Sequence, residues 1–354
     1  MAKRQFDVVT VGGAARDITF YTNEGRVVAT PRDPAFQKVF GFEYGAKINI
    51  EQAHFTFGGG AANAAASCAR LGLKTASLVR VGNDENGRLT LKNLQKIGVN
   101  AKFVQIDKNG TTGFSFIVST LKSREHTAFL YRGANDNLQL TTQNLKRLNA
   151  QWLYVSSLTG KHWRGNLKKI FLSPKTYHLK PKLAWNPGNI QLREGRGGLD
   201  KFIKLTDVLI LNKDEATELA LSDGGRQGTE NNKRLAAGNY NVGDLLRVLQ
   251  SWGAKTVSIT CGTKGAYVFD GKKIHYAGIY ETKRVDTTGA GDSFGSSFVA
   301  GLILYGNNIE KSLRLAMVNS GSVVTQIGAQ NGLLSRRQAE VAMRKIKMKI
   351  TRVS

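Results

Sequence analysis

The residues best suited to chemistry lie in one segment, VDTTGAGDSF at 285–294. The small residues Gly289, Ala290 and Gly291 allow a sharp backbone turn before a predicted helix and leave the first N–H groups of that helix free. Such an N-terminus binds anions through its amides and the helix dipole. In a phosphoryl transfer, it would stabilise the charge on the moving group.

Asp292 stands at the same helix N-terminus, where the dipole favours an ionised carboxylate. A carboxylate there can accept the proton of an attacking hydroxyl group as a general base. Aspartate also caps helices routinely, so the short motif alone leaves a structural role open. The helix that follows carries Phe294, Phe298 and Leu302 on one stripe and is predicted to be buried. This context favours the chemical role.

Composition excludes several other classes of protein. The chain has 354 residues, of which 41% are hydrophobic and 22% charged, an ordinary globular balance. Its two cysteines, Cys68 and Cys261, form no CxxC pair and no disulfide framework, and no HExxH zinc motif occurs. No GxxxxGK[ST] loop is present, and Gly12-Gly13 does not continue as GxGxxG. The sequence contains no run of 18 apolar residues, which a membrane span would require. We therefore expect a soluble, cytoplasmic protein.

The charge balance is strongly basic. The chain has 51 Lys and Arg against 26 Asp and Glu, a net charge of +25. Such a charge attracts anions such as nucleotides, phosphorylated metabolites or nucleic acid. A generally basic set of host proteins would explain it equally well. Nucleic acid is therefore not the expected partner.

The order of elements predicts an α/β fold. Residues 6–13 form a short β-branched run that ends in glycines, typical of a buried strand. Further predicted strands alternate with helices, and this alternation implies a mostly parallel sheet. These strands are expected at 75–81, 152–155, 182–185, 208–211, 256–260 and 266–269.

Two β-rich stretches, 18–57 and 102–132, differ from this alternation and resemble each other in character. Strands are predicted within the second at 102–106, 112–119 and 127–132. The economical arrangement pairs both stretches in a small sheet beside the α/β body, as a lid over the strand ends. Residues 221–243 are predicted to be a surface insertion and 336–354 a surface helix with a basic tail.

Six motifs together resemble the ribokinase-like sugar and nucleoside kinases, the PfkB carbohydrate kinase family. The segment at 285–294 resembles the family's C-terminal signature and GGGAAN at 58–63 its N-terminal one. The other motifs appear in the family's order, and the resemblance runs from about residue 6 to 340. They are VGNDENG at 81–87, NKDE at 212–215, TCGTKG at 260–265 and QIGAQ at 326–330, the last two on the nucleotide side.

The resemblance implies a three-layer αβα sandwich and one kinase domain over 1–354 with the lid inserted in it. Lid edges in such folds can pair into dimers, so a homodimer stays open. The resemblance also implies ATP and Mg²⁺ as cofactors and, in some members, K⁺. Asp292 would be the catalytic base, and the backbone of Gly289, Ala290 and Gly291 the anion hole. Asn212 and Glu215 would position Mg²⁺ and the phosphates through water. Thr260, Gly262 and Gly265 would bind the nucleotide. Asp286 and Thr288 would form the monovalent-cation site.

On the acceptor side, the resemblance assigns hydroxyl binding to Gly13, Asp17, Gly59 and Asn63. Aspartate and asparagine suit vicinal hydroxyls as acceptor and as mixed donor and acceptor. Purely structural roles stay open for three of these residues: an exposed turn residue for Asp17, a helix N-cap for Asn63, and a first-turn helix acid for Glu215.

The chain departs from ribokinases at the acceptor site. Gly60 stands where they have lysine, and Ser156-Ser157 lies where they have a glutamate. These differences put ribose in doubt and leave the kinase chemistry untouched. Arg132 ends a predicted lid strand, where it would meet an anionic acceptor or be solvated.

We therefore expect an ATP-dependent kinase that phosphorylates a hydroxymethyl group of a sugar. The alternative is a nucleoside kinase, with Phe20, Tyr21 or Phe42 stacking on a base. A third possibility is a non-catalytic nucleic-acid-binding or regulatory protein on the same fold.

Overall fold

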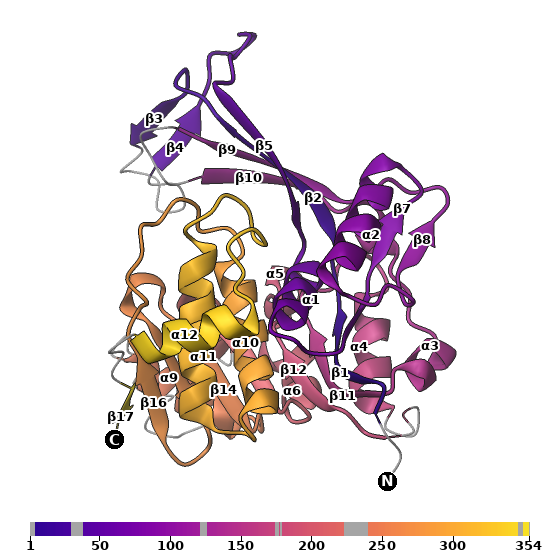
Figure 1. Ribbon diagram of the computed structural model, residues 1–354, viewed down its shortest axis with the longest axis vertical. Coiled ribbons are helices and arrows are strands. Elements are labelled where there is room, and N and C mark those ends of the chain that lie inside the picture. Colours follow the sequence, from indigo (N-terminus) through magenta and orange to yellow (C-terminus); the bar gives the residue numbers. More distant parts are fainter. Residues whose placement is uncertain are drawn as a thin grey trace.

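Buried β-branched segments build a central sheet of nine strands in the computed structural model (Figure 1), which describes residues 4–29, 38–120, 126–173, 177, 179–222, 240–345 and 350–353. Most of the predicted insertion at 221–243 lies outside the described residues. The strand order is β17 (Ile350–Val353), β16 (Ile274–Ala277), β15 (Ala266–Phe269), β14 (Thr256–Thr260), β13 (Val208–Asn212), β12 (Lys182–Trp185), β11 (Ala150–Val155), β1 (Phe6–Val11), β6 (Thr75–Leu78).

The sheet is mostly parallel, as predicted. Strands β14, β13, β12, β11, β1 and β6 pair in parallel, and β15, β16 and β17 extend one edge in antiparallel register. Parallel strands place their carboxyl ends at one edge, where ligands bind in such sheets. The loops that follow β1, β11, β13 and β14 therefore meet on one side of the molecule.

Helices cover both faces of this sheet, which confirms the αβα sandwich. Alternate residues of β1 point to opposite sides, so that Val8 joins one hydrophobic core while Val9 and Val11 join the other. Figure 1 shows α10, α11 and α12 in front of the sheet. The core with Val8 contains α1 (Gly60–Arg70), α10 (Ala290–Leu304), α11 (Ile309–Val323) and α12 (Arg336–Lys345). The opposite core contains α3 (Thr142–Arg147), α4 (Trp163–Leu172), α5 (Asn189–Leu192), α6 (Gly195–Ile203), α7 (Lys213–Leu221) and α9 (Val242–Ser251).

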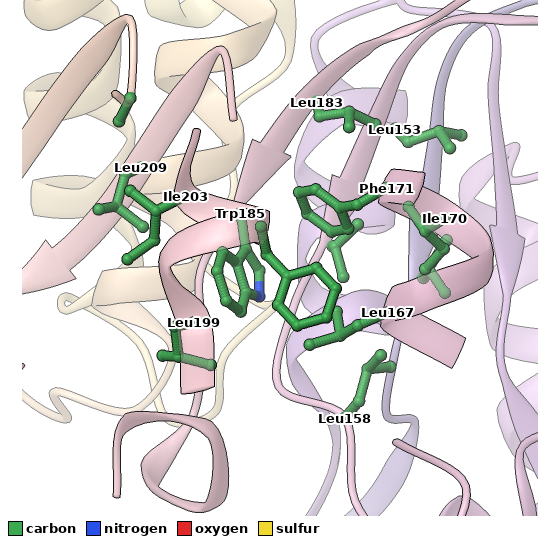
Figure 2. Packing of buried hydrophobic residues seen from close by; sticks show 14 of the residues in the cluster. Leu153, Leu158, Leu167, Ile170, Phe171, Leu183, Trp185, Leu199, Ile203 and Leu209 are labelled. Carbon is green, nitrogen blue, oxygen red and sulfur yellow. The ribbon is translucent and has the colours of Figure 1, made fainter. Parts of the chain in front are cut away.

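The core that contains Val9 and Val11, called the second core below, is organised around Trp185 at the end of β12. Its ring is fully buried and lies between Leu199 and Ile203 of α6 on one side and Phe171 of α4 on the other (Figure 2). The ring centroid of Trp185 is 5.4 Å from that of Phe171 and 6.2 Å from that of Phe202. Such tilted aromatic pairs add stabilisation beyond the buried area.

A second sheet projects beyond the body (Figure 1). It has four strands in the order β10 (His126–Tyr131), β9 (Phe114–Ser119), β2 (Ala15–Tyr21), β5 (Gln52–Gly58). These strands come from both β-rich stretches of the sequence. Along β2, Asp17 and Thr19 are buried, whereas Arg16, Ile18 and Phe20 on the opposite face are partly exposed. The face with Asp17 is therefore turned toward the body.

Three predicted elements differ from the structure. The strand expected at 102–106 is β8 (Gln105–Asp107), which pairs with β7 (Arg80–Gly82) outside the second sheet. The strand expected at 75–81 is divided into β6 and β7. The basic tail ends in β17, which pairs with β16. Remaining elements are the hairpin β3 (Arg26–Ala29) and β4 (Lys38–Gly41), α2 (Glu85–Ile97), and the short 3-10 helices Gly133–Asn137 and Gly262–Lys264. None of the described helices is long and apolar enough to span a membrane.

Removing the Trp185 ring should create a large cavity in the second core. We expect Trp185→Ala to lower the free energy of unfolding by about 3–5 kcal/mol, as measured by urea denaturation followed by circular dichroism. Leu172→Ala is the control, because Leu172 is 41% exposed. Its effect should stay within about 0.5 kcal/mol. Equal effects of the two substitutions would contradict the described packing.

Candidate active site

A cavity of about 220 Å³ lies at the carboxyl edge of the central sheet, against the N-terminus of α10. The ends of β13 and β14 and the start of α10 form its wall. It therefore collects six predicted nucleotide and catalytic positions, from three segments that are distant in sequence. The lining residues are Asn186, Ile210, Leu211, Asn212, Glu215, Thr260, Gly289, Gly291 and Asp292.

The N-terminus of α10 is held by the turn before it. Gly289 is the N-cap residue, with a left-handed backbone at φ +76°. A Cβ atom on Gly289 would lie 2.3 Å from the Cβ of Ala329, so the turn and the 326–330 loop are in close contact. Asp286 joins the same two segments: its Oδ1 accepts hydrogen bonds from the backbone N–H and hydroxyl of Thr288, and its Oδ2 accepts one from the N–H of Gly328 at 2.8 Å.

Asp292 is not the cap of this helix, because the cap is Gly289 and Asp292 lies inside the first turn. Its Oδ2 accepts a hydrogen bond of 2.8 Å from the amide of Asn63. Its Oδ1 lies on the side of Gly60, where a Cβ atom would be 3.4 Å from this oxygen. Burial raises the pKa of Asp292, and the hydrogen bond from Asn63 opposes that rise. One carboxylate oxygen thus accepts a hydrogen bond from Asn63, and the other lies on the side of Gly60, where no described donor contacts it.

Asn63 is a residue of helix α1 and is not its N-cap. The N-cap is Gly59, so the N-cap alternative is wrong. Its amide donates to Asp292, and its Oδ1 accepts a hydrogen bond of 2.9 Å from Gln330. Gln330 was singled out in the sequence only as part of the QIGAQ loop. Its contact with Asn63 spans 267 positions and left no local signal in the sequence.

Asp17 on β2 is buried, with 6% of its surface exposed, so the alternative of an exposed turn residue is wrong. Its Oδ1 accepts a hydrogen bond of 2.5 Å from the hydroxyl of Ser115. Burial raises the pKa of Asp17 from 3.8 to about 6, and the charges of Asp292 and Asp286 add to the rise. Asp17 and Asp292 both lie against the short 58–60 segment: a Cβ atom on Gly58 would be 1.9 Å from Oδ2 of Asp17, and one on Gly60 would be 3.4 Å from Oδ1 of Asp292. β2 therefore brings Asp17 to the same site as Asp292.

Gly13 and Gly59 form a close backbone contact at the start of α1. The carbonyl oxygen of Gly13 accepts hydrogen bonds from the N–H groups of Ala61 and Ala62. Gly59 has φ +91°, and a Cβ atom there would lie 2.6 Å from the Cα of Ala14. Both glycines thus allow the turn after β1 to pack on the helix that carries Asn63.

Asn135 was missed by the sequence analysis as a functional residue. Its side chain accepts from the N–H of Ala14 and donates to the carbonyl oxygens of Ala14 and Arg132. It therefore clamps the turn between β1 and β2 that leads to Asp17. Arg132 itself is exposed.

Asn212 and Glu215 form a capping box at the start of α7. The Oδ1 of Asn212 accepts from the N–H of Glu215, and the carboxylate of Glu215 accepts from the N–H of Asn212, both at 2.8 Å. Glu215 is therefore a first-turn acid of α7, as one alternative predicted, and it also lines the cavity. Burial raises the pKa of Glu215, and the charge of Asp292 adds to the rise.

A second cavity of about 480 Å³ adjoins the other side of the α10 N-terminus. Thr287 and Ala290 line it together with Gly262, Arg284 and the surface of α11. The predicted nucleotide residues are thus divided: Thr260 lines the first cavity and Gly262 the second.

Gly265 lines neither of these two cavities. It is a turn residue at φ +83°, where a Cβ atom would lie 2.1 Å from the carbonyl oxygen of Ala277. Its contribution is therefore to shape the loop that carries Gly262.

A family model, pfkB family carbohydrate kinase, matches residues 35–336. The chain belongs to this family. It is thus a carbohydrate kinase, and the resemblance drawn from the motifs is confirmed. The match covers Gly59, Asn63, the α10 segment and the 326–330 loop, whereas Gly13 and Asp17 precede it.

Named relatives agree with this assignment. Ribokinase from Haemophilus influenzae is 26% identical over 296 residues, which cover 83% of this chain and 89% of that protein. The structure of Arabidopsis thaliana ribokinase complexed with ribose and ATP superposes with a TM-score of 0.72 at 21% identity, covering 96% and 99% of the chains. A nucleoside kinase from Methanocaldococcus jannaschii, an archaeal member of the ribokinase family, has a TM-score of 0.69 at 22% identity, covering 97% and 100%.

The raised pKa of Asp17 predicts a pH-dependent stability. The folded protein binds this proton more tightly than the unfolded chain, so the associated stability is present below pH 3.8 and is lost as the pH rises through about 6. Asparagine cannot ionise. We expect Asp17→Asn to raise the midpoint of thermal unfolding relative to wild type at pH 8, and to raise it less at pH 4.5.

The matched control is Glu43→Gln, because Glu43 is an exposed carboxylate. Its difference from wild type should not change between the two pH values. A difference for Asp17→Asn that is the same at pH 4.5 and pH 8 would contradict a raised pKa in the folded state.

The two glycines of the α10 turn should respond differently to alanine. In Gly289→Ala, the added methyl group would clash with Ala329 and alanine would have to adopt the left-handed backbone of this turn. The substitution should therefore lower the free energy of unfolding by about 1–3 kcal/mol. A Cβ atom on Gly291 meets no heavy atom within 4 Å, so Gly291→Ala should leave thermal unfolding unchanged or raise its midpoint. Its methyl group enters the 220 Å³ cavity, however, and should lower kcat by about 10²-fold. Full activity of Gly291→Ala would show that no reacting group passes this position.

Proposed function

We propose that this carbohydrate kinase transfers the γ-phosphate of ATP to a hydroxymethyl group of a sugar, with Asp292 as the general base. The observation that carries the proposal is the position of Asp292 Oδ1. This oxygen faces Gly60 at the N-terminus of α1, while the carboxylate lines the cavity at the N-terminus of α10. A hydroxyl group beside Gly60 would lie between the base and a phosphoryl group at the helix N-terminus.

In this mechanism Asp292 accepts the proton of the acceptor hydroxyl group as the hydroxyl oxygen attacks the γ-phosphorus. The bond from this phosphorus to the bridging oxygen of the β-phosphate breaks, and ADP leaves. The first N–H groups of α10 stabilise the charge that develops on the transferred group, because they are fixed by the Gly289 turn before the reaction starts. Asp17, Gly13 and Gly59 position the acceptor. The second sheet, above this site, would exclude water as a lid.

ATP fits the arrangement of the two cavities. They meet at the N-terminus of α10, since Thr287 and Ala290 line the larger one while Gly289 and Gly291 line the smaller one. The adenosine part would occupy the larger cavity near Gly262, and the phosphates would cross the helix N-terminus into the smaller. The Arabidopsis relative with the same fold was solved with ATP, which supports this choice of nucleotide.

Mg²⁺ fits the smaller cavity chemically. Its lining includes the carboxylates Glu215 and Asp292, and none of the described lining residues is cationic. A polyphosphate therefore needs a cation to enter beside these carboxylates. The described residues contain no group of three His, Cys, Asp or Glu that would cage a metal. Glu215 and Asn212 would hold Mg²⁺ through water, and the ion would neutralise phosphate charge.

A monovalent cation such as K⁺ at Asp286 and Thr288 stays a prediction. The Oδ2 of Asp286 accepts one described hydrogen bond, from Gly328, and so keeps a lone pair for a cation. Comparing turnover in potassium chloride and in choline chloride at equal ionic strength would test it.

The nucleoside alternative rests on one aromatic residue. Phe20 contacts Phe116, away from the Asp17 face of β2, and Phe42 pairs with Phe40 in the hairpin region. Tyr21 lies on the same face as Asp17, and its pKa is raised by burial and, in addition, by the charge of Asp286. Tyr21 is therefore the residue available to stack on a base, and a nucleoside kinase shares this fold.

Three further expectations stay predictions: a cytoplasmic location, a homodimer, and the lack of a nucleic-acid partner. The outer face of the second sheet carries the exposed Phe55, Phe116 and Phe129 in one row across the strands. Copies of the chain could associate through it, and the molar mass in solution would decide. A steep fall of duplex DNA affinity with salt would instead reveal a nucleic-acid surface.

The acceptor should be identified first. ADP release from Mg-ATP would be measured with ribose, fructose, 2-keto-3-deoxygluconate, fructose phosphates, adenosine, cytidine and guanosine. Turnover of one sugar would support the proposal, and turnover of nucleosides alone would favour the alternative. The absence of both ADP release and ATP binding would favour a non-catalytic protein.

Asp292→Asn tests the proposed base. We expect kcat to fall by about 10²–10⁴-fold because the amide cannot accept the proton. ATP affinity, measured by calorimetry, should remain, since the helix N-terminus is unchanged. A twofold loss of kcat would remove Asp292 from the role of base.

A further inference from the structure

Four polar side chains form a chain of hydrogen bonds that ends on Asp292. Asn93 on α2 donates to Oε1 of Gln330 at 2.9 Å, and Gln330 donates through Nε2 to Oδ1 of Asn63 at 2.9 Å. Asn63 on α1 donates through Nδ2 to Oδ2 of Asp292 at 2.8 Å. Residues from α2, the 326–330 loop, α1 and α10 are thus connected by three hydrogen bonds.

The direction of this chain is set by its last member. An ionised carboxylate only accepts hydrogen bonds, so the atom of Asn63 that faces Asp292 must be the NH₂ group. The carbonyl oxygen of Asn63 then faces Gln330, which must in turn offer its own NH₂ group. Gln330 thereby prevents the amide of Asn63 from turning its carbonyl oxygen toward the carboxylate.

We propose that Gln330 is a positioning residue for the catalytic base and acts through Asn63, without contact with substrate. This inference rests on the proposed function of Asp292. The oriented amide of Asn63 fixes Oδ2 and keeps the lone pairs of Oδ1 on the side of Gly60, where the acceptor hydroxyl would lie. Asn63 is then part of the support of the base in addition to any contact with sugar hydroxyl groups.

The position of Gln330 also couples the base to the anion site. Two residues earlier in the same loop, Gly328 donates its N–H to Asp286, and the intervening Ala329 packs against Gly289. One short loop therefore holds both the N-terminus of α10 and, through Asn63, the side chain of Asp292.

Other ionisable groups face Asp292 and remain unchanged in the variants below. They are Asp17 of the second sheet, Glu215 of α7 and the buried hydroxyl of Tyr154 on β11, each of which has a pKa raised in part by the charge of Asp292. The effect of Gln330 must therefore be measured as a difference from wild type.

Two substitutions of Gln330 separate orientation from packing. Gln330→Leu removes the donor to Asn63. Gln330→Glu keeps the shape but places a carboxylate against the Oδ1 of Asn63, which favours the reversed amide and turns a carbonyl oxygen toward Asp292. The control is Gln95→Glu, which makes the same change of charge and shape at an exposed residue of α2.

The pH profile of kcat/KM is the decisive readout with the acceptor found in the panel. We expect the acid limb to move to higher pH in Gln330→Leu and further in Gln330→Glu, because each weakens donation to the carboxylate of Asp292. At a fixed pH of 7, kcat should fall about tenfold or more, with KM for ATP unchanged. Gln95→Glu should keep the wild-type profile.

A second readout does not need turnover. The carboxyl carbon of Asp292, identified by ¹³C NMR as the signal missing in Asp292→Asn, should titrate at higher pH in both Gln330 variants than in wild type. Unchanged titration and an unchanged acid limb in both variants would overturn the proposal. If wild-type protein phosphorylates no acceptor, the proposed function fails, while this titration still decides whether Gln330 acts on Asp292.

Discussion

The arrangement of the site depends on the contact between the turn before α10 and the 326–330 loop. Asp286 ties the two segments by hydrogen bonds to Thr288 and Gly328, and the bare backbone of Gly289 lets Ala329 approach. A helix N-terminus stabilises developing charge only when it is fixed before the reaction, because reorientation during the reaction would cost free energy. The buried helix behind it, with Phe294 and Phe298 in the core, keeps that end in place.

The site is acidic, whereas the chain as a whole is strongly basic. A protein with a net charge of +25 places the carboxylates of Glu215 and Asp292 in the wall of a small cavity. Burial raises the pKa of Asp17, Asp292 and Glu215, and the charge of Asp292 adds to the rise for Asp17 and Glu215. Such a group of carboxylates is suited to bind hydroxyl groups and a hydrated cation rather than a bare anion. The basic exterior can attract an anionic nucleotide, while the interior requires that its phosphates arrive with a cation.

The motifs were sufficient to predict most of the site because each is local. The Gly289–Asp292 turn, the Asn212–Glu215 capping box and the glycines before α1 are specified by residues a few positions apart. The αβα layers likewise follow from alternating strands and helices, whose apolar periods are visible along the chain. Local patterns failed where pairing partners were distant: residues 105–107 have strand character, but only tertiary contacts place them beside β7.

The sequence by itself determined which residues could act as base, anion site and phosphate neighbours, since backbone freedom and side-chain chemistry are properties of short segments. Tertiary structure alone decided what each side chain touches. Asn63 has the chemistry of a hydroxyl ligand, yet its amide is directed at Asp292 by Gln330, a residue 267 positions away. Asp17 is an ordinary aspartate until the second sheet buries it beside other carboxylates. Hydrogen-bond direction and burial arise only when distant segments exclude water together, so no local pattern could reveal them.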